Sequence, residues 1–160
     1  MKKQISLRAI SAIALLIILV LAAAQNSASG QGKAKRLVGT WRTQGTVINC
    51  QTGTQLATFR GLNTFLGEGS MVANGAINPA LLSTGHGVWE HAGGRDFTNT
   101  IVSFRFNPDG TFAGTQKIKR SIELDGGGDE FTSVNSVELA DPAGNVTFTG
   151  CSTETGHRLE

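Results

Sequence analysis

The chain has 160 residues, of which 39% are hydrophobic and 16% charged, and its formal net charge is +2. This length suits one domain with an N-terminal appendage. Three of the 14 basic residues, Lys2, Lys3 and Arg8, lie in the first eight positions, which leaves 11 against 12 acidic residues. The remainder is close to neutral, so we expect no nucleic-acid partner.

The first 24 residues have the pattern of a signal peptide. A basic start precedes the apolar run 10–24, which ends in small residues that include Ala22 and Ala24. A run of about 15 residues is shorter than the ~20 of a spanning helix. We therefore expect a cleaved signal-peptide helix at 1–24, a disordered leader at 25–36 and a secreted or periplasmic domain at 37–160. A retained anchor is the alternative, and no stable membrane anchor is expected after cleavage.

Two runs of alternating apolar residues flank the turn Asn107-Pro108-Asp109-Gly110. Alternation with period two predicts strands, and this turn chemistry predicts a hairpin with Gly110 in the left-handed region. The turn is predicted to pair Phe106 with Phe112, and Phe104 with Gly114. The hairpin is not stable alone, so we expect the other strands to close over its apolar face, which comprises Val102, Phe104, Phe106, Phe112, Ile118, Ile122 and Leu124.

The pattern predicts eight strands, at 37–50, 56–60, 62–72, 85–91, 97–106, 111–124, 130–140 and 146–158. The longest loop is expected at 73–84. In the last hairpin, Val137 and Leu139 conflict in direction with Val146 and Phe148, and a bulge in 131–134 would explain the conflict. Eight short strands without a helical period favour a closed all-β, antiparallel up-and-down barrel. Such a barrel holds side chains or one small ligand.

Cys50 and Cys151 are the only cysteines. An exported chain with an even number of cysteines favours a disulfide between them. Two separate buried thiols are the alternative. No C-x-x-C or comparable spacing is present, so we expect no metal or redox role.

The triplet Gly39-Thr40-Trp41 opens the first predicted strand, and the chain here resembles the lipocalin and calycin superfamily. The resemblance implies a lipocalin-like barrel in which an arginine near the end of the last strand, matched by Arg158, packs across Trp41. Gly39, Trp41 and Arg158 are therefore candidate structural residues. The segments 85–90, 104–116 and 144–151 also resemble a group of small secreted bacterial proteins of unknown function. Neither resemblance implies a cofactor.

The stretch 85–91 holds the densest group of chemically active side chains. His86 and Glu90 share one face of the predicted strand, and an imidazole with a carboxylate serves as an acid–base pair or as metal ligands. Four residues span roughly 13 Å along a strand. The pair therefore needs help from Glu154 and His157, which requires strand eight to lie alongside. Structural or hydrogen-bonding histidines are the competing interpretation.

Gln116 and Arg120 share the alternation of Ile118, so they point into the barrel if that face lines it. An inward arginine binds a carboxylate or another anion through its planar fork. The alternatives are an internal ion pair and an arginine at the rim, and Arg105 is the other polar residue embedded in this hairpin. The candidate ligand-binding residues are His86, Glu90, Gln116 and Arg120.

Three functions remain open from the sequence. The first is a non-catalytic barrel that binds a small apolar or amphipathic molecule. The second is a barrel enzyme that resembles an allene-oxide-cyclase isomerase, and the third is a structural or interaction protein with a filled core. No catalytic residue, metal ion or cofactor is predicted, and no oligomeric state follows from the sequence. Clustered His, Glu and Arg inside a cavity would favour the enzyme.

Overall fold

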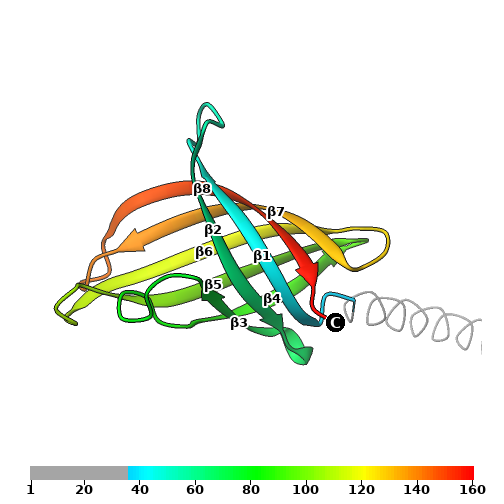
Figure 1. The fold of residues 1–160 in the computed structure, drawn as a ribbon, viewed down its shortest axis with the longest axis horizontal. Helices are drawn as coiled ribbons and strands as arrows, with labels where there is room; N and C mark the ends of the chain where they lie inside the picture. The colour runs from blue at the N-terminus through cyan, green and yellow to red at the C-terminus, as the bar shows by residue number, and fades with distance from the viewer. Residues whose placement is uncertain (1–35) are drawn as a thin grey trace, which may run out of the picture.

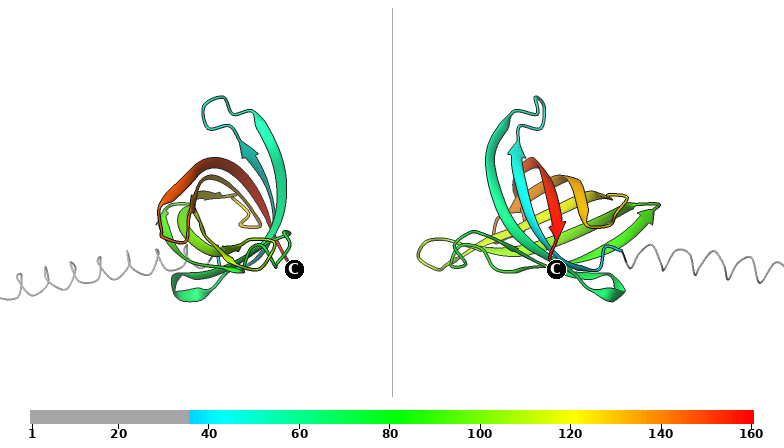
Figure 2. Two further views of the ribbon diagram at one scale, coloured as in Figure 1. Left: turned by 90° about the vertical axis from the view of Figure 1, so that its left-hand side faces the viewer. Right: turned by 45° about the vertical axis from the view of Figure 1, so that its right-hand side comes forward.

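A computed structural model describes residues 36–160, so the predicted signal peptide and nearly all of the predicted leader lie outside the described residues. Eight antiparallel strands, each bonded to its neighbours in chain order, form a closed barrel (Figures 1 and 2). The predicted all-β up-and-down barrel is therefore confirmed. The strands are β1 (Gly39–Ile48), β2 (Gln55–Phe65), β3 (Ser70–Gly75), β4 (Gly85–Gly93), β5 (Asp96–Phe106), β6 (Phe112–Leu124), β7 (Glu130–Ala140) and β8 (Val146–Arg158).

Pairing of β1 with β8 closes the barrel, from Trp41 opposite Arg158 to Ile48 opposite Cys151. The predicted disulfide between Cys50 and Cys151 is confirmed, and it joins the chain just beyond β1 to β8 with Cα atoms 5.3 Å apart. Beyond this bond the β1–β2 hairpin extends away from the other strands (Figure 1). No helix among residues 36–160 is long and apolar enough to cross a membrane.

Aromatic side chains fill the end of the barrel where β1 begins and β8 ends. The Trp41 and Phe131 rings are 5.1 Å apart, and Phe65 lies within 6.3 Å of both Trp89 and Phe131. Buried indoles need hydrogen-bond partners. Trp41 Nε1 donates to the Leu37 carbonyl at 3.0 Å. This half of the barrel is a packed core, completed by Leu37, Met71, Phe97, Ile122 and Leu124.

Arg158 covers the closed end, and its guanidinium lies 4.2 Å from the centre of the Trp41 ring. Arg158 Nη1 donates to the Val38 carbonyl at 2.8 Å, and Nη2 donates to the carbonyls of Arg36 and Gly128. The stacked arginine therefore joins the segment before β1, the β6–β7 turn and the end of β8. This arrangement is the one that the lipocalin resemblance implies for Trp41 and Arg158.

The predicted inner face of β5 is wrong. Phe104 is 56% exposed on the outer surface, and it faces Thr115 instead of Gly114. The cause is a bulge: Phe106 pairs with Phe112 as predicted, but Arg105 pairs with Gly114, so β6 has one extra residue. An extra residue reverses which alternate positions face inward. The inward residues of β5 are consequently Phe97, Asn99, Ile101, Ser103 and Arg105.

The boundary between the second and third strands also differs from the prediction. β2 continues through Gly61, which pairs with Thr43 and Gly75, and the chain turns instead at a 3₁₀ segment, Gly67–Gly69. Gly61 marks a close approach of neighbouring strands, because a Cβ there would lie 2.9 Å from the Asn74 carbonyl oxygen.

The conflict in the last hairpin is resolved by a bulge at its tip. The register shifts between Leu139 and Ala140, which places Leu139 opposite Phe148 and Ala140 opposite Val146. The bulge is therefore at 139–140 and not at 131–134, and Val137, Leu139 and Phe148 all line the interior.

Candidate functional site

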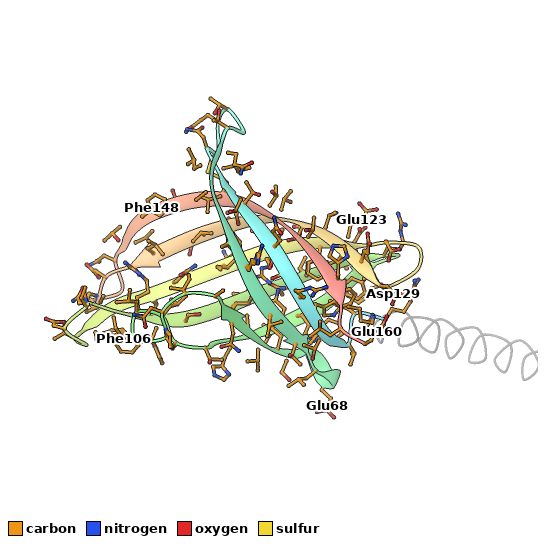
Figure 3. All side chains as sticks on the ribbon, viewed as in Figure 1. Glu68, Phe106, Glu123, Asp129, Phe148 and Glu160 are labelled. Carbon is orange, nitrogen blue, oxygen red and sulfur yellow. A yellow bond between two sulfur atoms is a disulfide. The ribbon has the colours of Figure 1, made fainter. Side chains whose placement is uncertain are left out.

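The half of the barrel opposite the packed core is hollow. It encloses a cavity of about 520 Å³. Phe106 and Phe148 mark this open end in Figure 3, whereas Glu68, Glu123, Asp129 and Glu160 lie toward the other end. The cavity is lined by the distal half of β1 and by residues of every other strand except β4.

An apolar belt forms the middle wall of the cavity. Ile101 and Ile118 face each other across β5 and β6, and Val137 pairs with Ile118 across β6 and β7. Phe59 covers Gly45 on β1, where a Cβ would come within 2.0 Å of the Phe59 ring. A glycine is needed at this position, because the ring packs directly against the β1 backbone.

A buried ion pair forms part of the cavity floor. Arg120 Nε lies 3.2 Å from Glu154 Oε2, and the two side chains are only 5% and 1% exposed. Asn63 Nδ2 donates to the other carboxylate oxygen of Glu154 at 3.2 Å. Burial lowers the pKa of the Arg120 guanidinium, and the Glu154 charge opposes that shift. The two opposite charges leave the floor neutral overall.

Several polar atoms of this layer have no hydrogen-bond partner among residues 36–160. They are Thr43 Oγ1, Arg120 Nη1 and both side-chain amide atoms of Asn99; Arg120 Nε and Glu154 Oε2 contact each other in the ion pair but make no hydrogen bond. An unpartnered buried polar group costs about 1–3 kcal/mol. The polar layer between the aromatic core and the apolar belt therefore lowers the stability of the fold. A layer that does so is a candidate functional feature.

Arg105 occupies the mouth of the cavity on the inner face of β5. On one side it pairs with Gly114 of β6, and on the other it forms a bridge with Leu82. Within residues 36–160, Arg105 makes no ion pair. Ser103 and Gln116, which are cross-strand partners, lie one step further inside.

Two of the four candidate ligand-binding residues line the cavity, and two do not. Gln116 and Arg120 are inside. His86 and Glu90 are exposed on the outer face of β4, because Trp89 takes the inward position. Strand β8 pairs with β1 and β7 and not with β4. The combination of His86 and Glu90 with residues of β8 is therefore not formed.

Glu154 lines the cavity floor, but the sequence analysis named it only as a possible partner of His86 and Glu90. The sequence held a signal for it, since Glu154 lies four positions before Arg158 on β8. Positions separated by an even number share a face of a strand, so an inward Arg158 implies an inward Glu154. His157 has the opposite parity, so it points outward, and it lies 3.2 Å from Glu130 at the surface.

Fold and cavity together define a class: an antiparallel eight-stranded barrel, consistent with a lipocalin-like fold, with one end packed and the other hollow. Comparisons with known proteins add no family to this class. No protein-family model matches the chain, and no curated protein or solved structure matches it.

Proposed function

We propose that this protein is an exported binding protein that holds one small apolar or amphipathic molecule in the open half of its barrel. The observation that carries the proposal is the cavity of about 520 Å³, with an apolar belt above a polar floor. Ligand sites typically measure 300–1,000 Å³ and combine apolar walls with a few polar groups. The disulfide supports export, because such bonds persist in oxidising compartments.

The hollow half argues against a barrel whose whole interior is filled for structural reasons. Trp41, Trp89, Phe65 and Phe131 occupy the closed half, whereas the other half encloses about 520 Å³ of free space. A protein that needed only stability would gain from filling this space, because interiors pack to crystal-like density.

A fluorescence titration tests the proposal. N-phenyl-1-naphthylamine, a neutral apolar probe, should brighten on entering the cavity and saturate at one site per chain. Ser103→Phe places a ring inside the cavity and should abolish most of the signal. Val102→Phe is the matched control, since Val102 is next along β5 and faces outward. Equal signals from S103F and the unmodified protein would refute binding in the cavity.

A second candidate, a barrel isomerase, is favoured by one observation. Arg120 and Glu154 place a cation beside a carboxylate at the floor, which is a pattern of acid–base catalysis. The three histidines do not contribute, because His86, His91 and His157 are not among the residues that line the cavity.

Molecules that co-purify with the protein from its own host separate the two candidates. A binding protein should return its ligand unchanged after prolonged incubation, as followed by chromatography and mass spectrometry. Conversion of the ligand to an isomer, lost in Glu154→Gln, would establish the enzyme instead.

A further inference from the structure

The charges around the cavity are unbalanced, and the excess is at the mouth. Two inward-facing arginines line the cavity, Arg105 and Arg120, against one carboxylate, that of Glu154. The cavity therefore carries a net positive charge. A hollow with low-dielectric walls concentrates the field of its charges, so this excess attracts anions.

The floor is a poor place for an anion. Arg120 is already paired with Glu154 at 3.2 Å, and neither side chain is open to water. A second carboxylate at the floor would lie close to that of Glu154, and two carboxylates at one site repel each other strongly when water is excluded. Binding an anion there would require Arg120 to give up its present partner or Glu154 to take up a proton.

The mouth is a better place. Arg105 has its side chain on the inward-facing positions of β5, is half-buried, and has no ionic partner among the described residues. Its planar guanidinium offers several donors to a carboxylate, sulfonate or phosphate. Toward the floor, the apolar belt at Ile101, Ile118 and Val137 suits an uncharged chain.

We infer that the ligand is an amphipathic anion bound with its charged group at the mouth, against Arg105, and its apolar body inside. This inference rests on the proposed binding function and adds the charge and the direction of the ligand. The buried Arg120 then serves as the partner of Glu154 and does not receive the charged group.

A pair of probes of equal length tests the inference. Decanoate and 1-decanol have the same number of carbon atoms but differ in the head group, which is a charged carboxylate in the first and a neutral hydroxyl in the second, and both are measured by displacement of N-phenyl-1-naphthylamine. Decanoate should bind more tightly at neutral pH. Arg105→Gln should reduce this preference about 3- to 10-fold, the range of a partly exposed charge-assisted contact. The preference should also shrink as salt is added, since charges near the surface are screened.

Two further variants complete the test. Arg42→Gln is the matched control, because Arg42 is an exposed arginine on the outer face of β1, and it should leave the preference in place. Arg120→Met with Glu154→Leu removes both floor charges, and it should change the affinities of the two probes together. A preference lost in R120M/E154L and kept in Arg105→Gln would place the anion at the floor and overturn the inference, with the binding function intact.

Two other outcomes are decisive. Equal or tighter binding of 1-decanol by the unmodified protein would overturn the inference alone. Failure of the neutral fluorescent probe itself to bind would overturn the proposed function, and the inference with it.

Discussion

The ion pair between Arg120 and Glu154 allows the sharpest test of the structure. Replacing Arg120 by Met removes the cation but keeps a side chain of similar length. Glu154 is then left as a carboxylate that is 3% exposed, with Asn63 as its remaining hydrogen-bond partner among the described residues. An uncompensated charge in that position strongly opposes folding.

The magnitude follows from the geometry. At 3.2 Å, two unit charges attract by about 5 kcal/mol at an effective dielectric constant of roughly 20. Removing one partner of a buried pair costs about 3–5 kcal/mol in measured cases, whereas replacing both by apolar groups is neutral or stabilising by about 1–4 kcal/mol. We therefore expect Arg120→Met to lose about 3–5 kcal/mol of unfolding free energy, and R120M/E154L to be at least as stable as the unmodified protein.

Urea unfolding followed by tryptophan fluorescence measures these differences, because Trp41 and Trp89 are both buried. Lys117→Met is the matched control. Lys117 pairs with Glu138 at 3.1 Å, but both side chains are about one-third exposed, so its loss should matter far less. The reasoning is refuted if Arg120→Met and R120M/E154L lose the same stability, since the cost would then come from lost packing and not from the stranded charge.

Three further predictions concern the closed end and the disulfide. Replacing Cys50 and Cys151 by Ala should lower the unfolding free energy by about 4–5 kcal/mol in the chain-entropy model for a separation of 101 residues, and reductant should no longer shift the urea midpoint. Arg158→Lys should lose about 2–4 kcal/mol in urea unfolding, because an ammonium group replaces neither the stack nor the planar set of donors; a midpoint unchanged by the lysine would contradict this account. Backbone hydrogen bonds from Glu130 and the turn before it lower the pKa of Asp125 to about 2. Because the folded pKa lies below the ordinary value of 3.8, this stabilisation is present above about pH 4 and disappears as the pH falls through 2. Asp125→Asn should therefore lower the thermal midpoint at pH 6 but not below pH 2.

The sequence predicted the barrel because its hairpins have strong local signals. The turn Asn107-Pro108-Asp109-Gly110 and the alternation in β6 both depend on nearby residues. By contrast, a shift of one residue in the β5–β6 register decides which residues of β5 point inward. The bulge at Gly114 shifts that register, and a glycine with positive φ (+108°) at this position is visible only once the backbone is known.

Only part of the candidate site was predicted, and strand parity again explains which part. Arg120 follows the alternation of Ile118 on β6, and the sequence predicted it to point inward if that face lined the barrel. His86 and Glu90 were chosen as candidates for their chemistry. Trp89 has the opposite parity on the same strand, and its burial places them on the outer face, since an aromatic ring contributes more by burial than a histidine or a glutamate. Parity with a bulky apolar neighbour was thus a better guide than a group of titratable residues.

The stability of the two floor charges bears on what the cavity is for. Apolar residues at 120 and 154 would join the aromatic core to the apolar belt and extend the packed interior. A greater stability of R120M/E154L would mean that Arg120 and Glu154 lower the stability of the fold, as several buried pairs do. Arg120 and Glu154 lie directly under the cavity, so their role would concern the ligand. A charged and hydrogen-bonded floor stops an apolar chain from penetrating into the core. In that case the floor sets how deep a ligand goes, and the charge of the ligand has to be met at the mouth.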